Sequence, residues 1–145
     1  MSDAELATAR VRQLLDLTRR LTDRLAAETR AFEEGRPQDV AASLAETQEM
    51  ANLYRRDSGH VKANPALLSG APMEDRRTLI DATREFEAAL TRHSRAVDAA
   101  RQISEGLVRA IAAEVTSART PASAYAADGR ASLGDGRAVA LNRMA

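Results

Sequence analysis

The longest pattern of apolar positions lies in the second half of the chain. Between residues 79 and 111, apolar or small side chains recur in steps of three and four, interrupted once by a histidine: Leu79, Thr83, Phe86, Leu90, His93, Val97, Ala100, Ser104, Leu107 and Ile111. Such steps keep one face of a helix turned toward a partner. The pattern predicts a long helix over residues 73–118. Pro72 suits its first turn, and Thr120-Pro121 is expected to end it.

The N-terminal third predicts a first helix over residues 3–34. Ser2 followed by Glu5 has the spacing of a capping box, and Gly35 is a good left-handed cap at the other end. The expected buried face contains the same steps of three and four, flanked by Leu17: Ala7, Val11, Leu14, Thr18, Leu21, Leu25, Glu28 and Phe32.

A second helix is predicted over residues 37–62. It begins with Pro37 in the first turn and ends at Asn64-Pro65, because proline disfavours a helical conformation at the preceding residue. Residues 62–73 then form a connection, and the first two helices form a tight hairpin. The expected buried face is Val40, Leu44, Thr47, Ala51, Tyr54, Ser58 and Val61.

Composition supports an all-α fold. Aromatic residues make up only 3% of the 145 residues, which is too little bulk for a thick globular core, and good helix formers dominate. We therefore expect an elongated antiparallel three-helix bundle or coiled coil with a long third helix and a flexible C-terminal tail. The predicted domains are a helical bundle over 1–118 and a tail over 119–145.

The third helix is predicted to be longer than the other two and to extend past them. Its distal part would then expose an apolar stripe, which is typical of an interaction site. Small residues within the stripe would let another helix approach closely. The expected protein-binding residues here are Val97, Ala100, Ser104, Leu107 and Ile111.

The tail is rich in Ala, Gly and Ser and has no segment long enough to fold alone. It nevertheless contains apolar side chains that could contact a partner, and Tyr125 is the best of these because its large ring loses little conformational entropy on binding. The other expected anchors are Leu133, Val139, Leu141 and Met144.

The chemistry of the chain argues against an enzyme. It lacks cysteine, a glycine-rich phosphate loop and a nucleophile motif. Asp57 and His60 are too few for a metal site, and Glu28 and His93 are expected to fix helix register. We expect no cofactor and no metal.

The charge balance and hydropathy bear on the environment of the chain. Lys plus Arg and Asp plus Glu each number 21, so the net charge gives no reason to expect nucleic acid. The first residues include early acids and no apolar core of signal-peptide length, and no run of 18 apolar residues occurs, so we expect no signal peptide. We expect a cytoplasmic protein without membrane insertion.

The helical layout also resembles a known family. A hairpin, an Asn-Pro break, a long third helix and the segment Pro121-Ala-Ser-Ala-Tyr-Ala-Ala-Asp-Gly-Arg130 resemble the FlgN-type flagellar export chaperones, in the divergent form seen in alphaproteobacteria. The sharpest local element is Tyr125-x-x-x-Gly129, which adds Gly129 to the expected binding residues.

The resemblance implies a function that composition and spacing do not. It implies a cytosolic type III export chaperone that binds the assembly-prone helical termini of hook-filament junction (hook-associated) proteins and contacts export apparatus components. Two alternatives stay open: a homo-oligomeric coiled-coil protein, in the simplest case a homodimer, and a regulator that sequesters a partner helix.

Overall fold

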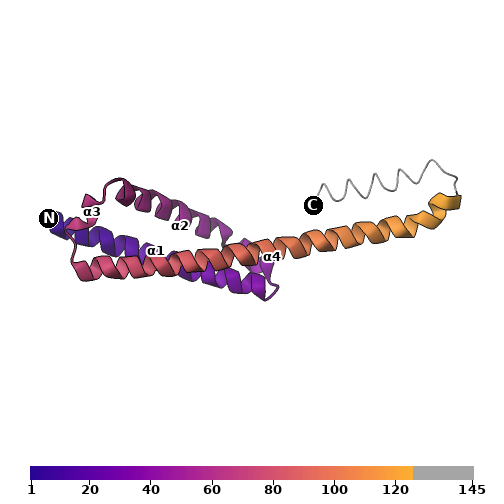
Figure 1. Ribbon diagram of the computed structural model, residues 1–145, viewed down its shortest axis with the longest axis horizontal. Helices are drawn as coiled ribbons and strands as arrows, with labels where there is room; N and C mark the ends of the chain where they lie inside the picture. Colours follow the sequence, from indigo (N-terminus) through magenta and orange to yellow (C-terminus); the bar gives the residue numbers. More distant parts are fainter. Residues whose placement is uncertain (126–145) are drawn as a thin grey trace. The chain divides into compact units, whose positions relative to one another are not determined.

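The computed structural model describes the backbone of residues 1–125 and the side chains of residues 1–118. Four helices occur in this part of the chain: α1 (Asp3–Glu33), α2 (Pro37–Ala63), α3 (Ala66–Ser69) and α4 (Met73–Tyr125) (Figure 1). Residues 1–125 contain no strand, so the predicted all-α class is confirmed. The chain divides into two compact units, Met1–Val97 and Asp98–Ala145. The predicted division into a helical bundle over 1–118 and a tail over 119–145 stays a prediction.

The ends of the first two helices follow the local signals in the sequence. The Ser2 amide donates to Glu5 Oε2 at 2.8 Å, and the Glu5 amide donates to Ser2 Oγ at 3.2 Å, which completes the predicted capping box. Gly35 has φ of 72°, the left-handed conformation that glycine adopts without steric cost. Pro37 occupies the first turn of α2.

The predicted connection after α2 contains a short helix, α3. Asn64 caps α2 as expected, with φ of −141°. Pro65 has φ of −58°, which is already helical. The same proline that ends α2 is therefore suited to start the next helical turn.

The predicted end of the long helix near residue 118 is not observed, because α4 continues to Tyr125. Pro121 is therefore inside the helix. A proline removes one backbone N–H from the helical ladder. Pro121 lies in the second-last turn of α4, so the missing hydrogen bond leaves the backbone hydrogen bonds in the earlier turns of α4 intact.

Helix α1 is the centre of the unit Met1–Val97. Its N-terminal half packs Val11 and Leu14 with Leu79 of α4, and its C-terminal half packs Leu21 and Leu25 with Phe86. Residue numbers therefore rise together along α1 and α4. The predicted buried face of α1 is confirmed apart from Phe32, which is half-buried: Ala7, Val11, Leu14, Leu17, Thr18, Leu21, Leu25 and Glu28 are buried.

Helix α2 runs antiparallel to α1 and is less buried than its pattern predicts. Among its residues only Val40 and Thr47 are buried, and Leu44 is 46% exposed. Tyr54 and Val61 are half-buried beside the core clusters. The apolar face of α2 is thus only partly covered by its neighbours.

Candidate protein-binding surfaces

The face predicted on the long helix is exposed over most of its length. Leu107 is 61% exposed and Ile111 is 51% exposed, and Ser104 is also exposed, whereas Ala100 is half-buried. These four residues belong to the unit Asp98–Ala145. Val97, which is 38% exposed, is the last residue of the other unit.

Exposed apolar side chains on this part of α4 follow a spacing of four residues. We name Ile103, Leu107, Ile111 and Val115 the distal row; all four are exposed, and Ile103 is 73% exposed. Rows with this spacing form the ridges that pack into grooves of other helices. The sequence pattern missed Ile103, which is one position outside the steps of three and four. The recurrence of Ile or Leu at every fourth position was the available signal.

Charged side chains occupy the opposite side of the same helix. Arg101 pairs with Asp98 at 3.1 Å and with Glu105 at 3.8 Å.

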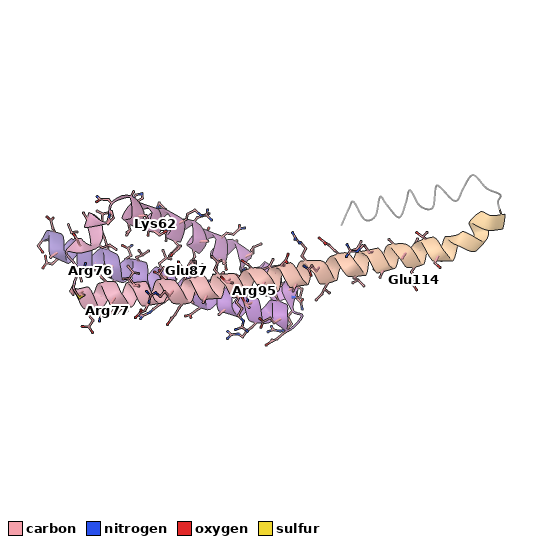
Figure 2. The ribbon with its side chains drawn as sticks, viewed as in Figure 1. Lys62, Arg76, Arg77, Glu87, Arg95 and Glu114 are labelled. Atoms are coloured by element: carbon pink, nitrogen blue, oxygen red, sulfur yellow. The ribbon has the colours of Figure 1, made fainter. Side chains whose placement is uncertain are left out.

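Glu114 lies instead on the same side of the helix as the distal row. It follows Leu107 by seven residues and therefore lies within about 20° of it around the helix. Glu114 is exposed and makes no ion pair among the described side chains (Figure 2). The distal row thus has a single acidic group beside it.

The predicted anchors of the tail fall outside the described side chains. Tyr125 is the last residue of α4, and its side chain is not described. Gly129, Leu133, Val139, Leu141 and Met144 lie outside the described residues. Their role in binding stays a prediction.

Three helices meet at a buried carboxylate in the unit Met1–Val97. Glu28 of α1 is only 5% exposed. The Thr47 hydroxyl of α2 donates to its Oε2 at 2.6 Å, and Nε2 of His93 on α4 lies 3.1 Å from its Oε1. Phe32 contacts the His93 ring edge-on, with ring centroids 6.2 Å apart. The sequence singled out Glu28 and His93 separately, and the structure joins them.

This polar contact has the properties of a register device. Each oxygen of Glu28 has one partner, and the partners come from two different helices. Sliding either helix by one turn would leave a buried carboxylate unpaired, which is costly. The ion pair of Glu33 with Arg92, at 2.9 Å, joins α1 and α4 next to it.

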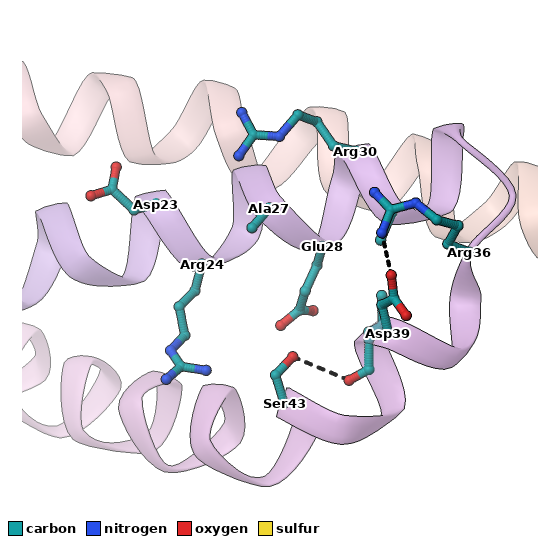
Figure 3. A pocket seen from close by; sticks show the side chains of 10 residues that line it. Asp23, Arg24, Ala27, Glu28, Arg30, Arg36, Asp39 and Ser43 are labelled. Carbon is teal, nitrogen blue, oxygen red and sulfur yellow. Dashed lines mark hydrogen bonds and ion pairs between the residues drawn. The ribbon is translucent and has the colours of Figure 1, made fainter.

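A cleft of about 590 Å³, with several charged residues in its lining, opens beside Glu28, between α1 and α2 (Figure 3). Arg36 faces Asp39 across its mouth. Hydrogen bonds to Glu34 and Asp39 raise the pKa of Arg36, and Arg24 pairs with Glu46. Arg24 and Arg36 thus bind partners within this protein, and the charged residues that line the cleft are balanced, three basic and three acidic.

A second, more apolar groove of about 370 Å³ lies between α2 and α4, with α1 as its floor. We name it the α2–α4 groove. Leu14 and Thr18 line its floor, Tyr54 and Val61 line the α2 wall, and Leu79, Ile80 and Thr83 line the α4 wall. Sequence reasoning missed this groove because it treated the apolar face of α2 as fully buried.

Tyr54 stands at one end of the groove. Its ring packs against Phe86, with centroids 4.6 Å apart. Burial raises the pKa of the Tyr54 hydroxyl, and the nearby Glu87 carboxylate raises it further. At the other end of the groove lies Lys62, which makes no ion pair among the described side chains (Figure 2).

Two further observations concern only the described residues. No three metal-ligating side chains converge there. None of the described helices has an apolar stretch that is long enough and sufficiently free of charge to cross a membrane.

One comparison with known proteins found a strong similarity. The flagellar basal-body protein FlbY of Caulobacter vibrioides (strain ATCC 19089 / CIP 103742 / CB 15) is 48% identical to this chain over 142 residues. The match covers 96% of this chain and 95% of the relative. No family model and no solved structure matches. The expected link with flagellar proteins agrees with the name of this relative, while the resemblance to FlgN-type chaperones stays a prediction.

Proposed function

Because this chain belongs to the family of the flagellar basal-body protein FlbY, we propose that it acts in flagellar assembly as a cytoplasmic export chaperone. In this proposal it binds the assembly-prone terminal helices of hook-associated proteins and keeps them competent for type III export. It has no catalytic function and needs no cofactor.

The observation that carries the proposal is the exposed distal row. Four aliphatic side chains, from Ile103 to Val115, share one side of α4 and are between 39% and 73% exposed. A soluble chain gains nothing by exposing such a row alone, and exposed apolar patches commonly mark protein interaction sites. The row matches the spacing by which an amphipathic helix is recognised, with contacts at every third or fourth residue.

The chemistry of the row also suits temporary binding. A cargo segment that folds on binding loses conformational entropy, and this loss offsets part of the gain from apolar contact. Ala100 and Ser104 extend the surface with small side chains, and Glu114 is the one charge beside it among the described side chains. Binding of moderate affinity would permit transfer of the cargo to the export apparatus.

In the proposal, the segment from Tyr125 onward adds a second contact to the same cargo. Its apolar residues are spaced along a chain that is otherwise Ala, Gly and Ser. Two linked contacts bind more tightly than either alone because the second is intramolecular.

A pull-down from the source bacterium tests the proposal. Tagged full-length protein is used as bait, and the retained proteins are identified by mass spectrometry. The proposal expects hook-associated proteins among them, and fewer of them with a Leu107→Asp bait. Recovery of rod or ring proteins in place of hook-associated proteins would contradict it.

A second candidate function is that of a structural part of the basal body. The name of the 48% identical relative favours it. The distal row would then be a permanent contact within an assembly. Purified basal bodies, probed with an antibody against this chain, separate the two functions, because a chaperone is absent from the finished structure and a structural part is retained.

A further inference from the structure

Two apolar surfaces have no partner among the described residues, and they complement each other. The α2–α4 groove lies wholly within the unit Met1–Val97, and the distal row lies wholly within the unit Asp98–Ala145. We propose that the distal row of one copy docks in the α2–α4 groove of a second copy.

The groove matches the length of three of the four residues in the distal row. The α4 wall of the groove extends from Leu79 to Glu87, and Ile103 to Ile111 covers the same number of residues, while Val115 lies one turn beyond. Each distance is about 12 Å along a helix. The groove is concave, with walls from two helices and a floor from a third, which is the form that accepts the ridge of a further helix.

The charges that line the groove favour one direction for the incoming helix. Val61 packs with the cluster that contains Leu79, and Tyr54 packs with Phe86, so Lys62 and Glu87 mark opposite ends of the groove. Glu114 follows Ile111 by three residues. Ile111 must therefore lie at the Leu79 end for Glu114 to meet Lys62.

This direction has a second favourable consequence. Ile103 then lies at the other end of the groove, near Tyr54 and Phe86. The incoming helix runs antiparallel to α4 of the host copy and completes a four-helix arrangement with its α1, α2 and α4. A parallel orientation would instead bring Glu114 toward Glu87, a like charge, as well as Arg84, whereas Lys62 is the charged lining residue at the Leu79 end.

If the proposed function holds, this docking would regulate access of cargo to the distal row. The distal row is the surface proposed to bind cargo, so a docked second copy would cover it until cargo displaced that copy. Self-association is measured without cargo, which keeps the failure of this inference separate from the failure of the proposed function.

Two blocked variants test the docking directly. Ile80→Asp blocks the groove, and because Ile80 is 52% exposed, the core is unaffected. Leu107→Asp blocks the distal row. Sedimentation velocity is measured on the full-length protein over a concentration series, and circular dichroism checks that each variant is folded.

The expected result is complementation. Wild type associates, each variant alone is monomeric, and an equimolar mixture associates because one variant retains the groove and the other retains the row. Three results would overturn the inference: a wild type that is monomeric throughout the series, variants that associate alone, or a mixture that stays monomeric. Association of Ile80→Asp alone, with Leu107→Asp monomeric, would indicate a symmetric contact between distal rows.

Charge reversal tests the orientation. Lys62→Glu and Glu114→Lys should each weaken association about fivefold, as expected for an ion pair at an interface rim. The double variant should regain wild-type association. Arg55→Glu is the matched control, since Arg55 is exposed on α2 and does not line the groove. If the double variant associates more weakly than either single variant, by the product of their two separate losses, the proposed orientation is wrong.

Discussion

The carboxylate of Glu28 and Nε2 of His93 lie 3.1 Å apart although 65 residues separate them in the chain. Glu28 is 5% exposed, and Thr47 of α2 binds its other oxygen. The contact therefore fixes α1, α2 and α4 in one register. The long apolar pattern alone would permit helices to slide by a turn, because its steps repeat.

Glu28→Ala should lower the free energy of unfolding by about 2–4 kcal/mol, because it removes both hydrogen bonds and leaves Thr47 and His93 without their buried partner. Urea unfolding measures the change. Glu33→Ala is the control, since it removes the exposed ion pair with Arg92 next to this contact and should cost less than about 1 kcal/mol. Equal losses in the two variants would show that Glu28 has no special role.

Two glycines give opposite predictions for the same substitution. Gly35→Ala should destabilise the protein by about 1–2 kcal/mol because Gly35 has φ of 72°. Gly59→Ala, inside α2, should stabilise it by about 0.5–1 kcal/mol. An added Cβ meets no atom within 4 Å at either position, so only the backbone differs. Thermal or urea unfolding of the two variants checks the prediction, and a change of the same sign in both would contradict it.

The raised pKa of Tyr54 leads us to predict that the protein loses stability at high pH. Its pKa in the folded protein is raised above the ordinary value of 10.0, by burial first and by Glu87 second. The folded state therefore holds the proton more tightly than the unfolded state. The resulting stability is present below pH 10 and is lost as the pH rises through the higher folded pKa.

Urea midpoints at pH 9 and at pH 11 measure this effect. Tyr54→Phe should reduce the difference between the two midpoints, because phenylalanine does not titrate. An unchanged difference would assign the alkaline loss to other groups.

Removal of residues 126–145 should weaken cargo binding and leave the melting temperature of the helical part unchanged. The reason is that both clusters of buried apolar residues lie within residues 7–86, and of the described buried apolar residues only Ala112 lies nearer to the removed segment. Binding to hook-associated proteins and thermal unfolding are measured on the same truncated protein. Tyr125→Ala in the full-length chain asks whether the predicted best anchor accounts for the loss. A clear drop in melting temperature would make the segment part of the fold.

Much of the fold was predictable because its signals are local. The capping box at Ser2, the left-handed Gly35 and the buried face of α1 depend on residues a few positions apart, and all three are confirmed. Helix α3 and the continuation of α4 past Pro121 were not predicted, because proline can start or interrupt a helix as well as end one.

The candidate surfaces were less predictable because they depend on how tightly helices pack. A pattern of apolar residues shows which face of α2 should be buried, but it does not show that Leu44 stays 46% exposed or that a groove remains beside Tyr54. Likewise Glu28 and His93 each appeared as a polar interruption, and only the parallel arrangement of α1 and α4 brings them together.

The central claim is that the distal row binds the terminal helices of hook-associated proteins. Isothermal titration of purified chain with a synthetic terminal segment of such a protein measures this directly. Ile111→Asp should weaken binding about 30-fold or more, as for a central interface residue. Ala113→Asp adds the same charge two positions away, on another side of α4, and should bind as wild type does. Equal affinities for wild type and both variants, or no binding by wild type, would contradict the claim.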